Sequence, residues 1–101
     1  MARYELEVVT KKGNKFRDGK RTLKETRVYA CMLAKKYDAV VYISKWENYW
    51  KQIEFIFYDP AKYSYMDFRP GFYLQKLHGK RSRVSPKTGD LLEVSKTRRY
   101  V

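Results

Sequence analysis

Residues 22–37 read TLKETRVYACMLAKKY, and this stretch predicts the main helix of the chain. Thr22 and Glu25 have the spacing of a capping box, in which each side chain satisfies a backbone N–H that the first helical turn leaves unpaired. At 100° per residue, one face of the helix collects the side chains expected to face the core, namely Leu23, Thr26, Ala30, Leu33, Ala34 and Tyr37. We therefore expect a helix over about residues 23–37 that packs on the rest of the domain.

Stretches on both sides of this helix alternate in hydropathy with the period of two that is typical of half-buried β-strands. Residues 4–8 form one such stretch, and residues 39–44 and 52–57 form a pair joined by a connection short enough for a hairpin. Asp59-Pro60 ends the pair, because Pro cannot donate to a strand ladder. Further strands are expected nearer the C-terminus, over residues 72–77, 81–84 and 91–94.

These elements predict an α+β fold, with one main helix (about 23–37) packed on a largely antiparallel sheet in the order β-α-β-β-β(β). With 101 residues, the chain has room for a single compact domain over residues 1–101. Turn residues such as Gly13 and Gly19 predict a basic loop over residues 11–21. The last cations predict a short basic C-terminal tail over residues 96–101.

Positive charge is concentrated at the two ends of the chain. Lys and Arg total 23 against 11 Asp and Glu, which gives a formal net charge of +12. Residues 1–24 carry a net +5 and residues 76–101 a net +6, whereas residues 25–75 carry only +1. Because 44% of the residues are hydrophobic and 17% aromatic, the chain can bury a core and is not a disordered basic tail. Two basic ends around a nearly neutral middle are typical of a protein that binds polyanions.

The two basic ends supply the candidate nucleic-acid-binding residues. In the first, glycines let the backbone approach a phosphate chain closely while the cations neutralise it. In the second, Arg81 and Arg83 are two residues apart, so on a strand both point to one face, and each guanidinium can fork onto a phosphate. The candidates are Lys11, Lys12, Lys15, Arg17, Lys20, Arg21, Lys80, Arg81, Arg83 and Lys87.

The middle of the chain has more aromatic residues than a core of this size can hold. If Phe55 and Phe57 face the core, the opposite face of the same strands carries Val40, Tyr42, Ile56 and Tyr58. Val28 and Met32 likewise lie off the core stripe of the helix. Either the sheet wraps over these residues, which we favour, or a protein covers them, such as a second copy in a homodimer. The candidate partner interface is Tyr42, Trp46, Trp50 and Tyr58.

Few residues suit catalysis or metal binding. One His and one Cys cannot provide the four N or S ligands of a structural zinc site, and the five isolated glycines form no phosphate-binding loop. Cys31 lies inside the expected helix and is interpreted as a small apolar residue. His78 stands among cations that favour its neutral form, which is able to abstract a ribose proton, so a metal-free RNase is kept as a third alternative. We expect no catalytic residue, no metal and no cofactor.

These observations predict a small basic nucleic-acid-binding protein, non-enzymatic, that holds the phosphates of DNA or RNA with Lys and Arg clusters at both ends of the chain. The alternative is a phage- or virus-type interaction or inhibitor protein that binds a nucleic-acid-handling protein complex of a host. No apolar run approaches the roughly 20 residues of a membrane span, and no signal-peptide pattern opens the chain. We therefore expect no membrane partner and a location in the cytoplasm, or in the cytoplasm of a host cell.

Overall fold

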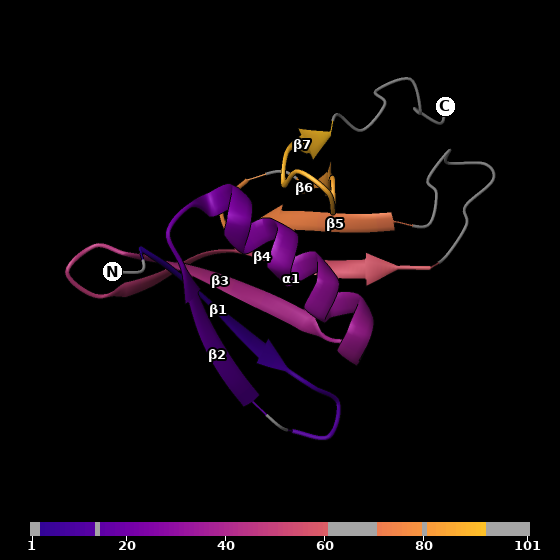
Figure 1. Cartoon of the computed structure of the whole chain (residues 1–101), viewed down its shortest axis with the longest axis horizontal. Helices are drawn as coiled ribbons and strands as arrows, with labels where there is room; N and C mark the ends of the chain where they lie inside the picture. The colour runs from indigo at the N-terminus through magenta and orange to yellow at the C-terminus, as the bar shows by residue number, and fades with distance from the viewer. Residues whose placement is uncertain (1–2, 14, 61–70, 80, 93–101) are drawn as a thin grey trace.

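The computed structural model describes residues 3–13, 15–60, 71–79 and 81–92, and these form one helix and one seven-stranded antiparallel sheet (Figure 1). The elements in chain order are β1 (Tyr4–Val9), β2 (Lys15–Lys20), α1 (Leu23–Tyr37), β3 (Val40–Trp46), β4 (Trp50–Asp59), β5 (Gly71–Lys76), β6 (Arg81–Val84) and β7 (Leu91–Leu92). The strand order across the sheet is β2-β1-β3-β4-β5-β6-β7. The predicted α+β class, one helix on an antiparallel sheet, is confirmed. No helix in the described part of the chain is long and apolar enough to cross a membrane.

Helix α1 begins and ends at the predicted residues because both caps are local. The Thr22 hydroxyl accepts a hydrogen bond from the Glu25 backbone N–H at 3.1 Å, which is the first bond of a capping box. The Glu25 carboxylate accepts from the same hydroxyl at 2.9 Å, instead of from the Thr22 backbone N–H. At the other end, Asp38 adopts a left-handed conformation and its N–H donates to the Ala34 carbonyl. Tyr37 was expected on the core face but is 39% exposed, because it is the last helical residue before this reversal.

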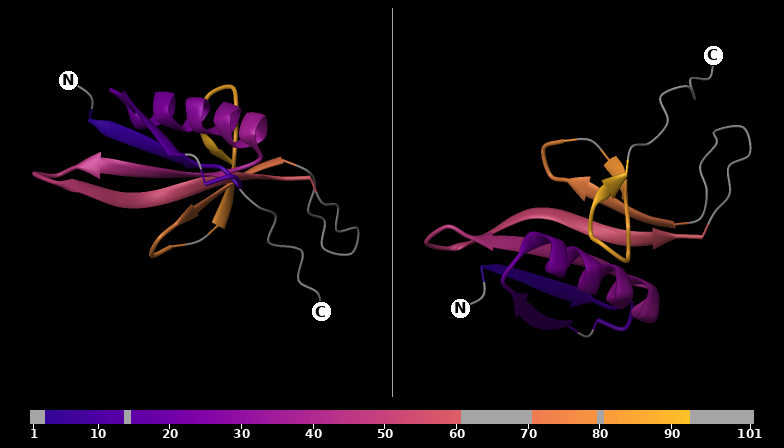
Figure 2. Two further views of the ribbon diagram at one scale, coloured as in Figure 1. Left: turned by 90° about the horizontal axis from the view of Figure 1, so that it is seen from below. Right: turned by 45° about the horizontal axis from the view of Figure 1, so that its top comes forward.

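The core lies between α1 and one face of the sheet, called here the helix-covered face (Figure 2). Its fully buried aliphatic side chains come from the central strands, and they are Leu6, Val8, Val41, Ile43, Ile56 and Leu74. From the helix, Ala30, Cys31, Leu33 and Ala34 pack against them. Burial of each large aliphatic side chain stabilises the fold by about 1.5–3 kcal/mol.

One ion pair is buried within this core. The Arg27 guanidinium donates to both carboxylate oxygens of Glu54, at 2.8 and 3.0 Å, from side chains that are 11% and 3% exposed. Arg27 was not among the helix residues predicted to face the core. The available signal was its position one turn from Leu23 and from Cys31, within the buried stripe.

The expected basic loop over residues 11–21 is largely a strand. Lys15–Lys20 forms β2, which pairs with β1 in the register Glu7↔Arg17, and only residues 11–13 form a described turn between the two strands. Asp18 and Gly19, expected as a second turn, lie inside β2. A charged strand at the sheet edge is a common solution, since charge opposes pairing with another chain.

The faces of β4 are the reverse of the expected ones. In the observed register Val41 pairs with Ile56 and Tyr42 with Phe55, so Ile56 lies beneath α1 while Phe55 and Phe57 lie on the opposite face. Tyr42 lies away from the core as expected, but it shares its face with Phe55 instead of lying opposite to it, and Ile56 faces the helix. Glu54 lies on the same inward face as Ile56, and its carboxylate is buried there by its pairing with Arg27.

The C-terminal hairpin folds back toward the start of α1. Residues 85–90 connect β6 to β7 as predicted, and Lys24 of the helix pairs with Asp90 at 2.8 Å. Gly89 has a φ of +79°, and a Cβ at this position would lie only 2.5 Å from the carbonyl oxygen of Lys24. Glycine is therefore needed both for the turn and for the close approach to the helix. Lys80 and the expected tail over residues 96–101 lie outside the described residues.

Candidate nucleic-acid interface

The face of the sheet that points away from α1 carries a row of aromatic rings across the adjacent strands β3, β4 and β5. Neighbouring ring centroids lie 5.8 Å apart for Tyr42 and Phe55, 6.2 Å for Phe55 and Phe57, and 5.9 Å for Phe57 and Tyr73. We call these four residues the aromatic row and their side of the sheet the aromatic face. Tyr73 is buried, whereas the other three rings are half-buried and keep part of their surface exposed. Such rings offer flat surfaces on which bases can stack.

Two arginines from β6 lie on the aromatic face beside this row. The register pairs Arg83 with Tyr73, which places both arginines on the same side as Phe57, as the sequence predicted for strand residues two apart. The Arg81 guanidinium lies 5.1 Å from the Phe57 ring centroid, within the range of a cation–π contact. The Arg83 side chain crosses above Gly71, and its buried Nε has no hydrogen-bond partner in the described part of the protein.

The opposite edge of the aromatic face is formed by β1 and β2. Arg17 contacts two carboxylates there, Glu7 at 3.3 Å and Glu5 at 3.8 Å, so its charge is compensated within the sheet. Lys15 lies on the same side by strand alternation and is exposed. From β2 to β6 there are five interstrand steps, or about 24 Å at 4.8 Å per step. The two candidate clusters therefore lie at opposite sides of the aromatic row rather than together.

Strand alternation divides the N-terminal cations between two faces. Lys20 lies on the helix side, where its ammonium group is 4.5 Å from the Tyr29 ring centroid. Lys11 pairs with Asp38 after the end of α1. The remaining candidates of the described part are exposed and without an ion pair there, and they are Lys12, Arg21 and Lys87. The cations that are close together in the N-terminal sequence therefore point to different sides of the folded protein.

The candidate partner interface is also divided. Trp46 and Trp50 pair at the tip of the β3–β4 hairpin, with centroids 5.3 Å apart in an edge-to-face arrangement, and are 41% and 39% exposed. Tyr42 belongs to the aromatic row. Tyr58 lies on the helix side, where it contacts Phe72 and the Lys35 ammonium group.

The aromatic row was missed because both faces of residues 53–58 carry apolar side chains, Phe55 and Phe57 on one face and Ile56 beside Glu54 on the other. A period of two then predicts a strand but not which residues face inward. The useful signal was Arg27 in the buried stripe of the helix, because a buried arginine needs a carboxylate and Glu54 is available on the strand beneath it.

The reactive residues considered from the sequence have different surroundings. Cys31 is buried on the core side of α1, and this burial raises the pKa of its thiol to about 12, so it is protonated and unreactive at neutral pH. His78 lies in the exposed turn after β5, and none of the described residues hydrogen-bonds to its ring. Among the described ranges, no three His, Cys, Asp or Glu residues gather as a metal site.

The chain matches no protein-family model, and no curated protein or solved structure shows significant similarity to it.

Proposed function

We propose that this protein binds single-stranded nucleic acid on the aromatic face and catalyses no reaction. The observation that carries the proposal is the aromatic row itself, flanked by Arg81 and Arg83 on one side and by Lys15 on the other. A strand that crosses the row would stack bases on Tyr42, Phe55 and Phe57. Its phosphates would contact the flanking cations.

The aromatic rings favour a single strand over a duplex. Bases in a duplex are already stacked on each other, so half-exposed rings on a sheet gain nothing from them. Unpaired bases can stack on such rings, at about 1–3 kcal/mol per base, and the stacking tolerates any base. Unpaired bases of DNA and of RNA can stack on these rings equally well. We place the interaction in the cytoplasm of the cell, or of a host cell.

The experiment measures the affinity for labelled oligo-dT and oligo-U by fluorescence anisotropy. The oligonucleotides are longer than the roughly 4–16 nucleotides that a comparable single-strand-binding domain covers. Phe57→Leu keeps an apolar side chain but removes the ring, and we expect it to weaken binding by roughly 5- to 140-fold. The matched control is Phe72→Leu, the same change on the neighbouring strand but on the helix side, which should leave the affinity unchanged.

The flanking cations are tested by the salt dependence of oligonucleotide affinity, with one cation changed on each side of the aromatic row. For single strands, each lost phosphate contact flattens the log–log slope of affinity against salt by about 0.7. Arg81→Gln together with Lys15→Gln should therefore reduce the slope by about 1.4 if each side chain holds one phosphate. Tighter binding to duplex than to single strands, or an unchanged Phe57→Leu variant, would refute the proposal.

A second candidate function rests on the exposed hairpin tip. Trp46, Tyr49 and Trp50 are 41%, 58% and 39% exposed, and Trp and Tyr are typical anchors in protein interfaces. These residues would serve an interaction protein that binds a nucleic-acid-handling complex. Trp50→Ala distinguishes the two functions, because it should leave oligonucleotide binding by the aromatic row intact while it weakens binding to such a complex.

A further inference from the structure

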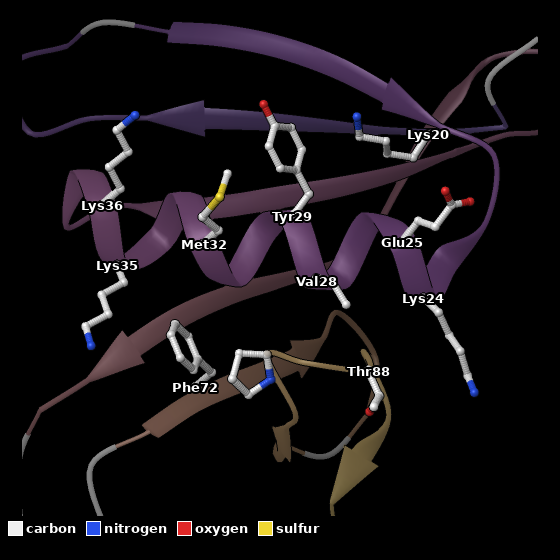
Figure 3. Close-up of a pocket in the computed structure, with 11 residues that line it drawn as sticks. Lys20, Lys24, Glu25, Val28, Tyr29, Met32, Lys35, Lys36, Phe72 and Thr88 are labelled. Carbon is white, nitrogen blue, oxygen red and sulfur yellow. The ribbon is translucent and has the colours of Figure 1, made fainter.

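A groove runs along the outward side of α1, opposite to the aromatic face (Figure 3). Its volume is about 830 Å³, and its apolar floor is formed by Val28 and Met32 of the helix, by Phe72 of β5 and by Pro86 of the β6–β7 turn. In Figure 3, Lys35 and Lys36 lie toward one end of the helix and Lys20 and Lys24 toward the other. We call this surface the lysine-rimmed groove. Nothing in the proposed nucleic-acid function uses it.

The apolar floor is unusual for the solvent side of a helix. Val28 and Met32 are one turn apart, so they form a continuous stripe, and Met32 is 50% exposed. Residues at such positions are polar when only water covers them. A flexible methionine side chain is well suited to contact with a partner's apolar groups.

The charges around the floor are strongly one-sided. Four lysines and a single acidic residue, Glu25, line the groove. Lys24 is paired with Asp90, and Lys20 lies 3.5 Å from Asp18. Lys35 and Lys36 contact only the rings of Tyr58 and Tyr37 and have no carboxylate partner among the described residues. Their position in the last helical turn suits the helix dipole, but the dipole does not explain the apolar stripe between the two ends.

We propose that the lysine-rimmed groove binds an acidic amphipathic segment of a partner protein. Apolar side chains of the segment would contact Met32, Val28 and Phe72, and its carboxylates would pair with Lys35 and Lys36. This is the arrangement of a helix laid in a hydrophobic groove with a charged rim. Binding here leaves the aromatic face free, so the protein would hold a nucleic acid and a partner at the same time.

The charge of the groove favours an acidic segment over two other possible occupants, a second copy of the chain and a nucleic acid. A second copy of the chain carries a net +12 and would bring lysines against lysines. A nucleic acid carries charge along its whole length, and it would place phosphates over the apolar floor of Val28, Met32, Phe72 and Pro86. An acidic segment with an apolar side matches both the rim and the floor.

The test uses the full chain and a fluorescent synthetic peptide. The probe is a helical peptide with Leu on one side and Glu on the others. Its controls are a scrambled peptide of the same composition and an analogue with Lys in place of Glu. We expect saturable binding of the amphipathic acidic peptide alone. Equal binding of the scrambled peptide, or no binding of the probe, would overturn the proposal.

Variants then place the peptide on the groove. Met32→Glu, and Lys35→Glu with Lys36→Glu, should each weaken peptide binding by about tenfold or more. The matched control is Lys51→Glu, an equally exposed cation at the start of β4 and away from the groove. Circular dichroism and urea unfolding show whether each variant is folded.

Two further measurements separate the other occupants. Analytical ultracentrifugation of the wild-type chain should show a monomer. A wild-type dimer that the Met32→Glu substitution dissociates would instead assign the groove to a second copy of the chain. Oligo-dT affinity of Met32→Glu should equal that of the wild type, and a marked loss would assign the groove to nucleic acid. Either result would overturn the inference, while failure of Phe57→Leu to weaken oligonucleotide binding would affect only the proposed function.

Discussion

The two faces of the sheet are built from alternate residues of the same strands, yet they differ in the type of side chain and in its burial. The helix-covered face holds medium aliphatic side chains, such as Ile56, that have no exposed surface. The aromatic face holds rings such as Phe55 and Phe57, which are half-buried and pack on each other rather than beneath another element of the described chain. Among the described aromatic side chains only Tyr73 is buried, and the rings on the helix side, such as Tyr58 and Phe72, also keep part of their surface exposed. The aromatic excess of the sequence therefore lies mostly outside the fully buried core.

The largest effect is expected from breaking the ion pair within the helix-covered face. Glu54→Ala leaves the Arg27 guanidinium buried without a partner, which should lower the free energy of unfolding by about 3–5 kcal/mol. Arg27→Met combined with Glu54→Leu should restore most of that loss, because an apolar pair suits the same space. Urea unfolding of the single and double variants measures both values. A Glu54→Ala variant as stable as the wild type would show that the pair is open to water.

The contrast between the faces is tested directly on two adjacent residues of β4. Ile56→Ala should lower the free energy of unfolding by about 2–5 kcal/mol, because it leaves a cavity in the core. Phe55→Ala should cost only about 1–2 kcal/mol, since the ring is half-buried, but should weaken oligonucleotide binding. Urea midpoints measure the stability of the two variants, and fluorescence anisotropy measures their oligonucleotide affinity. A larger loss of stability for Phe55→Ala than for Ile56→Ala would contradict the assignment of the two faces.

The close approach of the β6–β7 turn to α1 predicts a difference between two glycines. Gly89→Ala should cost about 2–4 kcal/mol, because the new methyl group meets the Lys24 carbonyl in addition to the strain of a positive φ. Gly13 has a similar φ of +86° but open space around it, so Gly13→Ala should cost only about 1–2 kcal/mol. Thermal unfolding compares the two, and equal losses would mean that the turn does not press on the helix.

The smallest effect concerns the pH dependence of the same contact. The hydrogen bond from Lys24 holds the pKa of Asp90 below its ordinary value of 3.8, with help from Thr88 and the Lys24 charge. Because the folded pKa is the lower one, this pair stabilises the fold above pH 3.8, and the contribution is lost as the pH falls through the folded pKa. Asp90→Asn should therefore lose slightly less stability than the wild type between about pH 5 and pH 2.

The control for that measurement is Glu47→Gln, at the exposed hairpin tip. Urea midpoints across the same pH range should show that it follows the wild type more closely than Asp90→Asn does. An identical pH dependence for wild type and Asp90→Asn would remove the Lys24–Asp90 contact from the anchoring of the turn.

Elements that depend on neighbours in the sequence were predictable. The bounds of α1 follow from Thr22, Glu25 and the helical period, and the β3–β4 hairpin follows from alternation around a short connection. The candidate site was predictable only in part. Arg81 and Arg83 lie on one face as expected, because two residues on a strand have a fixed relation. Their partners across the sheet could not be predicted, because strand order depends on contacts between distant segments.

The sequence by itself determined the α+β class, the helix and the concentration of charge at the two ends of the chain. Local caps, a 3.6-residue period and strand alternation are sufficient for these features. Only the tertiary structure decided which apolar side of β4 faces inward, through the pairing of Arg27 with Glu54 over 27 residues of sequence. It also turned the loop expected over residues 11–21 into β2, and so divided the N-terminal cations between the aromatic face and the helix side. The alternation of a strand separates its residues into two faces but does not determine which face is buried, and packing against another element decides that.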